Sequence, residues 1–213
     1  MDHPQQREEL VAFSRLASSS GLSVGTSGNL SIRVDDGVLI TPSGRDPEGT
    51  EAGDICLMDL DGNQIGGDLR PSSEVPMHLA VYRTSDASAV VHTHAPYATT
   101  LSLTIDELPA VHYTINGLGG PVRVAPYATF GTPQLAENIA AALVGRSAAI
   151  LQNHGAITTG ASVRQAFDRA VLLEWLCTLY WRALQVGTPK ILTESELAEV
   201  RDQAARLRYG SKR

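Results

Sequence analysis

The segment from Asn29 to Thr41 constrains the fold of this chain most. It alternates in the manner of a strand, and Asp36-Gly37 in its middle is a strong signal for a tight hairpin turn. The strand-like stretch DICLMDL (54–60) is followed by a second turn, Asp-Gly-Asn (61–63). Strands that are joined by such turns run antiparallel. We therefore expect an α/β chain with a central, mostly antiparallel sheet flanked by helices, rather than a doubly wound parallel sheet.

The rest of the chain predicts further helices and strands. Helices are expected from near Glu8 to Gly21, from Ser72-Ser73 with Pro76 in the first turn, from Thr132-Pro133, from Ser162 to Val186, and from the capping box Thr193–Glu196. Strands are expected at 89–94, 122–125 and 148–153, the last one stopped by Gly155. The chain lacks internal repeats and long linkers, so residues 1–213 predict a single domain.

Charge and composition argue against several classes of partner. The formal net charge is −6, and no run of basic residues provides a surface for nucleic acid. The polar N-terminus does not resemble a signal peptide, and no apolar run approaches the roughly 20 residues that span a bilayer. Cys56 and Cys177 form no CxxC motif or disulfide framework. We expect a cytoplasmic protein that binds neither nucleic acid nor membrane.

A set of histidines gives the central functional signal. His92 and His94 lie two residues apart in an expected strand, so both imidazoles share one face. His154 follows the apolar stretch AAILQ and therefore lies at an expected strand end. Three imidazoles suit Zn²⁺ and leave a fourth position open. Glu74, one residue inside the expected helix, is a candidate fourth ligand.

Other interpretations of these histidines stay open at this point. An isolated HxH pair is more often structural than metal-binding, and the pair gains weight only with the third histidine and the carboxylate. His78 lies one helical turn after Glu74 and is a rival ligand, although we favour a supporting or packing role. We interpret His112 as structural.

Three clusters of small polar residues predict an anion site. They are Gly-Thr-Ser-Gly-Asn (25–29), Thr-Pro-Ser-Gly (41–44) and Pro-Ser-Ser (71–73). Each one alone is typical of a turn or a cap. Together they offer backbone amides, hydroxyls and an expected helix N-terminus to a phosphate group. No Walker or dinucleotide motif is present.

The motifs as a set resemble the class II aldolase and adducin-like family, and within it the fuculose-phosphate aldolases. The matching strings are GTSGNLS (25–31), LITPSG (39–44), PSSE (71–74), VVHTHA (90–95), AVHYTI (110–115), APYATFGT (125–132), LQNHG (151–155) and Tyr209-Gly210. They follow the family order over nearly the whole chain. The resemblance implies the fold of that family, a homotetramer with active sites at subunit interfaces, and one Zn²⁺ per subunit.

The resemblance also implies a role for each matching residue. Zinc would be bound by His92, His94 and His154, with Glu74 as a ligand in the empty site and as the catalytic acid/base. The phosphate would be held by Gly28, Asn29, Ser43, Gly44, Ser72 and Ser73. Tyr113, Phe130 and Tyr209 would surround the aldehyde, with Tyr113 and Tyr209 counted as catalytic.

The implied reaction is the reversible cleavage of a ketose 1-phosphate through a metal-stabilised enediolate. The default substrate is L-fuculose 1-phosphate, which gives dihydroxyacetone phosphate and L-lactaldehyde. Relatives carry an aromatic residue three positions before the terminal tyrosine, where this chain has Arg206, and this departure bears on the aldehyde. The alternatives are a pentulose-phosphate 4-epimerase, a dehydratase of a methylthio-sugar phosphate, and a non-catalytic adducin-like interaction module.

Overall fold

The protein is built around one nine-stranded sheet with the strand order β4-β3-β2-β1-β5-β9-β8-β7-β6. A computed structural model describes residues 2–207. The strands are β1 (Asn29–Val34), β2 (Gly37–Ile40), β3 (Cys56–Met58), β4 (Gln64–Gly66), β5 (Ala89–Thr93), β6 (Glu107–Leu108), β7 (Val122–Ala125), β8 (Ala148–Leu151) and β9 (Gly155–Gly160). Neighbouring strands run antiparallel except β7 and β8, which are parallel. The expected mixed, mostly antiparallel sheet is confirmed.

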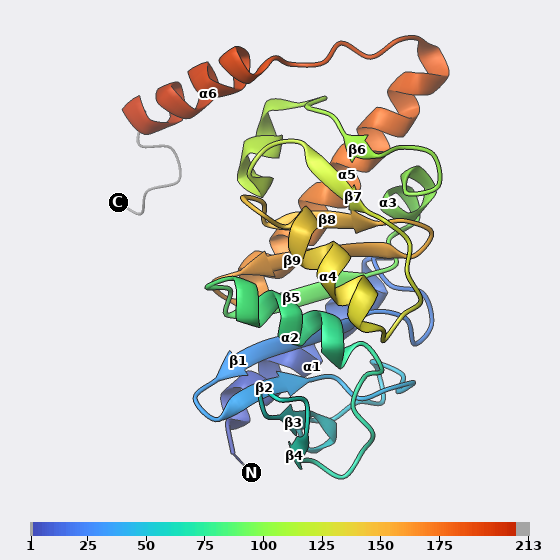
Figure 1. Ribbon diagram of the computed structural model, residues 1–213, viewed down its shortest axis with the longest axis vertical. Helices are drawn as coiled ribbons and strands as arrows, with labels where there is room; N and C mark the ends of the chain where they lie inside the picture. The colour runs from blue at the N-terminus through green and yellow to red at the C-terminus, as the bar shows by residue number, and fades with distance from the viewer. Residues whose placement is uncertain (1, 208–213) are drawn as a thin grey trace.

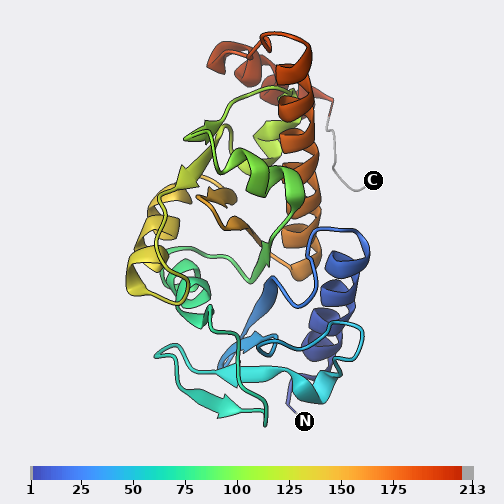
Figure 2. The ribbon, with the colours of Figure 1, turned by 90° about the vertical axis from the view of Figure 1, so that its right-hand side faces the viewer.

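Helices cover both faces of this sheet (Figures 1 and 2). On one face lie α2 (Val75–Thr84) and α4 (Pro133–Ala142), and on the other lie α1 (Pro4–Ser19), α3 (Pro96–Leu101) and α5 (Val163–Val186). Two short 3-10 helices, η1 (Ala52–Asp54) and η2 (Tyr113–Leu118), interrupt the loops, and α6 (Glu194–Arg206) follows a linker after α5. No helix in the described part of the chain is long and apolar enough to cross a membrane.

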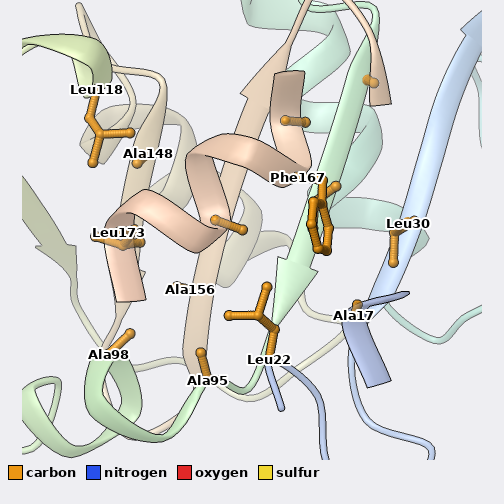
Figure 3. Packing of buried hydrophobic residues seen from close by; sticks show 14 of the residues in the cluster. Ala17, Leu22, Leu30, Ala95, Ala98, Leu118, Ala148, Ala156, Phe167 and Leu173 are labelled. Carbon is orange, nitrogen blue, oxygen red and sulfur yellow. The ribbon is translucent and has the colours of Figure 1, made fainter. Parts of the chain in front are cut away.

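Two hydrophobic clusters lie on the two faces of the sheet. On the α5 face, Phe167 and Leu173 of the helix and Ala156 of β9 belong to one cluster, and small strand residues let the helix approach closely (Figure 3). On the α2 and α4 face, Leu79 and Ile139 belong to the second cluster. Full burial of one such side chain contributes about 1.5–3 kcal/mol. Every residue of β5 is buried, so both cores hold this strand in a fixed position.

The expected strand at 148–153 is found as β8, but its expected end is wrong, because β8 ends at Leu151 and Gly155 begins the next strand, β9. This strand pairs with β5 in the middle of the sheet, and all of its residues are buried. A strand that is covered on both faces shows no polar–apolar alternation, so its sequence, GAITTG, gives a weak signal. A Cβ on Gly155 would lie 2.3 Å from the Thr93 carbonyl oxygen, so the glycine permits the two strands to approach.

The expected helix start at Ser72-Ser73 is also wrong. Helix α2 begins at Val75, and Glu74 is its N-cap residue. Pro42 and Pro71 form an isolated antiparallel bridge, and the Ser72 amide donates to the Thr41 carbonyl at 3.3 Å, so the chain is still paired with the end of β2 at this point. The Ser72 hydroxyl then accepts from the Glu74 amide at 3.2 Å. Because of this pairing, the helix begins only after Glu74.

Helix α1 begins at Pro4, earlier than the expected start near Glu8, because proline is tolerated at the first helical position. The three later helix starts agree with their expected caps. Thr132, Ser162 and Thr193 each accept a backbone N–H from the first turn, and Thr193 forms the expected capping box with Glu196.

Candidate functional site

Four side chains meet where β5 ends. His92 is the fourth residue of β5, and His94 follows the last residue of that strand. His154 lies in the turn between β8 and β9, whose strand β9 pairs directly with β5. Glu74 reaches the same place from the start of α2. In the described part of the chain, this is the one group of His, Cys, Asp and Glu that could hold a metal ion.

The geometry of this group is compact and almost symmetric. The ring centroids of His92, His94 and His154 are 4.9, 4.9 and 5.0 Å apart. The Nε2 atoms of His92 and His94 are separated by 3.0 Å. Glu74 Oε2 lies 3.1 Å from His92 Nε2, and Glu74 Oε1 lies 3.2 Å from His154 Nε2. All candidate ligand atoms fall within 4.8 Å of one another.

This spacing fits a divalent metal ion. His92 Nδ1 lies 2.9 Å from the Ala156 carbonyl oxygen, which can only accept, so Nδ1 carries the proton and Nε2 turns its lone pair inward. Two imidazoles that bind one zinc at about 2.0–2.1 Å in a tetrahedral arrangement have nitrogens about 3.3 Å apart. The buried Glu74 Oε1 has no hydrogen-bond partner. Inward lone pairs and an unpartnered carboxylate oxygen are the features that a bound cation would satisfy.

The charges in the group also suit metal ligands. Burial works to raise the pKa of Glu74, but His92, His154 and Asn29 together outweigh it and lower the pKa below its usual range. Burial, together with the nearby His92 and His154, lowers the pKa of His94 to about 4. The carboxylate is therefore ionised and the His94 imidazole neutral, which are the forms that bind metals.

Residues that the sequence analysis did not single out hold the group in place. Asn153 adopts a left-handed conformation (φ 55°), which asparagine tolerates better than most residues, and it creates the turn that presents His154. Its amide donates to the buried Ser102 hydroxyl at 3.1 Å. A Cβ on Gly155 would lie 3.2 Å from His94 Cδ2, so the glycine of LQNHG also leaves room for the ring. In the sequence, the Asn-His-Gly triplet (153–155) was the signal for this turn.

The three small-residue clusters converge beside the metal-ligand candidates. Gly28 has a positive φ of 82°, and a Cβ there would lie 2.9 Å from the His92 carbonyl oxygen, so this glycine packs on β5. Asn29 pairs with His92 in the sheet and donates from Nδ2 to Glu74 Oε2 at 2.8 Å. The Leu30 amide donates to the Thr41 hydroxyl at 3.2 Å, which joins the first cluster to the second.

The second cluster is joined in turn to the third. The Pro42–Pro71 bridge brings Ser43 and Gly44 next to Ser72 and Ser73, and the Ser43 amide donates to the Arg70 carbonyl at 2.9 Å. Ser72 is buried, whereas Ser43, Gly44 and Ser73 are exposed and accessible to a ligand. A polar surface therefore leads from solvent to Glu74.

The residues expected around the aldehyde lie in different places. Phe130 is exposed, and the adjacent Gly131 packs against the Ser73 carbonyl oxygen, so this loop borders the polar surface. Tyr113 lies on η2, apart from the four metal-ligand candidates. Its ring contacts that of His112, with the ring centroids 4.4 Å apart. It lines a hollow of about 300 Å³ with Val200, Gln203, Ala204 and Leu207 of the C-terminal segment. Tyr209 lies outside the described residues.

Two further histidines, His78 and His112, have other partners. His78 is fully buried, and burial lowers its pKa to about 3. Its two ring nitrogens contact Ser31 and Asn29, so it takes no place among the four ligand candidates. His112 packs between Tyr113 and Trp175, and its Nδ1 accepts from the Thr114 amide at 3.3 Å.

The chain is similar to known proteins over most of its length. Residues 8–181 match the family model of the Class II Aldolase and Adducin N-terminal domain. A 5-deoxy-D-ribulose 1-phosphate aldolase of Bacillus thuringiensis serovar kurstaki is 43% identical over 196 residues, which cover 91% of this chain and 92% of the relative. An L-fuculose phosphate aldolase of Escherichia coli K12 is 42% identical over 183 residues, or 84% of this chain and 85% of the relative.

The fold comparison points the same way. A solved structure of an L-fuculose 1-phosphate aldolase superposes with a TM-score of 0.92 at 37% identity and covers 96% of this chain and 98% of that one. The chain belongs to the class II aldolase and adducin family.

Proposed function

We propose that this protein is a zinc-dependent aldolase that reversibly cleaves a ketose 1-phosphate into dihydroxyacetone phosphate and a small aldehyde. The observation that carries the proposal is the compact group of Glu74, His92, His94 and His154 beside a polar surface built for an anion. An interaction module without catalysis would have no use for three inward imidazoles and an ionised carboxylate. The comparisons supply the reaction class, since the relatives named above are sugar-phosphate aldolases.

Zinc is the proposed ion because the donor set consists of three imidazole nitrogens and one carboxylate, a combination that suits Zn²⁺. An ion held there would polarise the substrate carbonyl. Glu74 is the proposed acid/base, since it is the one carboxylate in the group and its Oε1 has no hydrogen-bond partner.

The other residues have proposed roles in binding and in the second proton transfer. Asn29, Ser43, Ser72 and Ser73, with the backbone at Gly28 and Gly44, bind the phosphate. In cleavage, the carbon–carbon bond breaks as the neighbouring hydroxyl gives its proton to the phenolate form of Tyr113 and becomes the aldehyde. Glu74, which is ionised before the substrate binds, takes up a proton from solvent and delivers it to the carbon that becomes part of dihydroxyacetone phosphate, and Tyr113 returns its proton to solvent. Phe130 and Tyr209 border the aldehyde.

Two substrates agree with the relatives. L-Fuculose 1-phosphate would release L-lactaldehyde, and 5-deoxyribulose 1-phosphate would release acetaldehyde. Both ketoses end in a methyl group. We therefore propose a ketose 1-phosphate with a terminal methyl group as the substrate class, and L-fuculose 1-phosphate as the expected member of that class.

A shared active site follows from the place of Tyr113. Since this residue lies apart from the four ligand candidates, we propose a homotetramer in which Tyr113 of one subunit completes the site of the next. We also propose a cytoplasmic location. Both cysteines, Cys56 and Cys177, are buried and unpaired, which suits a reducing compartment.

A cleavage assay tests the reaction and its substrate. Purified protein with Zn²⁺ is given L-fuculose 1-phosphate, 5-deoxyribulose 1-phosphate, L-rhamnulose 1-phosphate and 5-methylthioribulose 1-phosphate in turn, and dihydroxyacetone phosphate is measured. We expect release from at least one of the two methyl-terminated ketoses named above. Release from none of the four, with zinc bound, contradicts the proposed activity. Epimerised product without dihydroxyacetone phosphate would favour the epimerase instead.

Elemental analysis tests the metal. About one Zn²⁺ per chain is expected in the wild type, and a large loss is expected in His94→Ala. His3→Ala provides a matched control, because His3 contacts Asp36 at 2.7 Å far from the site. Equal zinc content in the wild type and in both variants would contradict the assignment of His94 as a zinc ligand.

A further inference from the structure

A continuous set of buried side chains leads from Glu74 into the core. Asn29 donates to Glu74 at 2.8 Å, and His78 Nε2 lies 2.6 Å from Asn29 Oδ1. His78 Nδ1 lies 2.6 Å from the Ser31 hydroxyl, which in turn lies 2.7 Å from the Tyr82 hydroxyl. Exposed fractions in this set run from 0% for Ser31 and His78 to 7% for Glu74. These side chains are therefore shielded from solvent and depend on one another for their hydrogen bonds.

The chemistry of the groups fixes the direction of every hydrogen bond. The Glu74 carboxylate only accepts, so the Asn29 group that faces it is the NH₂. Asn29 Oδ1 then faces His78 and only accepts, so the proton of the imidazole sits on Nε2. His78 Nδ1 accepts from the Ser31 hydroxyl, and Ser31 accepts from Tyr82. All donors point in one direction, from Tyr82 toward Glu74.

We infer that His78 is a positioning residue that holds the Asn29 amide in the orientation that donates to Glu74. The carboxylate is thereby fixed at Oε2, and Oε1 stays 3.2 Å from His154 Nε2. If the amide turned over, its carbonyl oxygen would face the carboxylate and two acceptors would oppose each other. His78 prevents this, because its Nε2–H has a partner only when Oδ1 points toward it.

The positioning role of His78 also accounts for the buried polar side chains between α2 and β1, which the proposed reaction does not use directly. His78 and Tyr82 lie one helical turn apart on α2, on the side that faces β1, where Asn29 and Ser31 occupy alternate positions of the strand. Helix α2 and strand β1 thus lock together through polar groups inside the core. A buried polar network is costly unless every member is satisfied, and in this one every ring nitrogen and hydroxyl has a partner.

The first test is structural and does not depend on the proposed function. Crystal structures of His78→Leu and His78→Gln are compared with that of the wild type. Leucine removes the donor, so the Asn29 Nδ2–Glu74 Oε2 contact should be lost or the carboxylate should rotate. Glutamine keeps an uncharged N–H donor and should retain the contact. An unchanged contact in His78→Leu overturns the inference.

The second test measures the consequence for the site, and this part rests on the proposed function. Partners that orient a metal ligand change metal affinity or activity by about 10–100-fold when they are replaced. We expect a loss of this size in zinc affinity, measured by competition with a chelator, or in proton exchange on dihydroxyacetone phosphate for His78→Leu, with substantial recovery in His78→Gln. The control is Met77→Ala, which opens a cavity at the neighbouring buried position of α2 without touching the network.

The outcomes separate the two proposals. If the wild type neither binds zinc nor exchanges the proton, the proposed function fails, while the crystal structures still decide the role of His78. If His78→Leu and Met77→Ala lose metal affinity and exchange equally at equal loss of thermal stability, the role is only structural and the inference is wrong. Should His78→Leu fail to fold, Ser31→Ala replaces it. That variant frees His78 to take the other tautomer, and we expect about a threefold to tenfold loss, as for one neutral hydrogen bond. No loss would overturn the inference.

Discussion

The metal-ligand candidates and the hollow beside Tyr113 differ in how the chain builds them. His92 is fully buried and Glu74 is 7% exposed. His92 belongs to β5, which both cores hold, and Glu74 caps α2, whose buried residues belong to the second cluster. Tyr113 is 51% exposed and Leu207 is 67% exposed. Helix α6 is attached to η2 mainly through Asn116, which donates to the Leu197 carbonyl and accepts from Arg201, both at 3.0 Å. One region is embedded in the core, whereas the other is an attachment at the periphery.

This difference suggests a division of labour. Groups that transfer a proton beside a metal must be held within a fraction of an ångström, which a packed core achieves. Groups that select an aldehyde can lie on elements that vary without disturbing the sheet. We therefore expect the two halves of the reaction to be separable by mutation.

The largest effect is expected when the buried region is changed at Glu74. The Glu74→Gln variant keeps the shape of the side chain but cannot exchange a proton. Both cleavage and proton exchange on dihydroxyacetone phosphate should fall by roughly 10²–10⁴-fold, while zinc is retained. Exchange is measured by the loss of tritium or deuterium label from dihydroxyacetone phosphate. Near-normal exchange in a zinc-loaded variant would exclude Glu74 as the acid/base.

The second largest effect is expected for Tyr113→Phe, which should separate carbon–carbon cleavage from proton exchange. Tyr113→Phe removes only a hydroxyl from the peripheral region, so zinc content and proton exchange should stay near those of the wild type. Cleavage should fall by about 10²-fold, because the proton of the breaking hydroxyl has lost its acceptor. Parallel assays of exchange and cleavage check this. An equal fall in both assays would mean that the two regions do not work separately.

The same variant sharpens the question of which subunit supplies Tyr113. Inactive Glu74→Gln and Tyr113→Phe chains are unfolded together and allowed to reassemble. If Tyr113 serves the site of a neighbour, some mixed oligomers contain intact sites and cleavage returns. No recovery, with subunit mixing proven by mass spectrometry, would mean that both residues act within one chain.

A smaller effect is expected at the polar surface. Replacing Ser72 and Ser73 together by alanine should raise the KM for phosphorylated substrates by about tenfold or more, since a hydrogen bond to a charged group contributes about 1.5–3 kcal/mol. The kcat should change little. Ser20→Ala, at an exposed helix end, is the control. Equal losses with phosphorylated and unphosphorylated substrates would locate the phosphate elsewhere.

The sequence predicted most of this architecture because local signals were strong. The hairpin signal at Asp36-Gly37 and the caps at Thr132, Ser162 and Thr193 depend on neighbouring residues alone. The caps are found as expected, and the hairpin is found with its turn one residue earlier, at Asp35-Asp36. Strand β9 was missed because a strand buried on both faces has no alternation to detect. The start of α2 was misplaced because the Pro42–Pro71 bridge is a long-range contact.

For the site, the sequence predicted the metal-ligand candidates but not the buried residues that hold them in position. The HxH spacing and the LQNHG string identified the histidines that the structure brings together, and their roles stay predictions. The set that links Tyr82 to Glu74 could not be foreseen. It requires the register of β1 against β5 and the rotation of α2 about its axis, which place Ser31 against His78 although 47 residues separate them.

The smallest effect is expected at the C-terminal tail. Tyr209 is one of the residues expected around the aldehyde, and in the sequence it follows α6, whose C-cap residue Leu207 borders the hollow beside Tyr113. A chain that ends after Arg208 should therefore change the relative rates with lactaldehyde and acetaldehyde severalfold, because the border of the aldehyde site is altered. Zinc content and proton exchange should remain close to those of the wild type, since α6 packs on η2. The measurement is synthesis with each aldehyde from dihydroxyacetone phosphate, with Arg206→Ala as a companion variant that alters the helix end without shortening it. If the shortened chain loses exchange as strongly as aldehyde selectivity, the tail contributes to the buried region, and the separation between core and periphery would have to be abandoned.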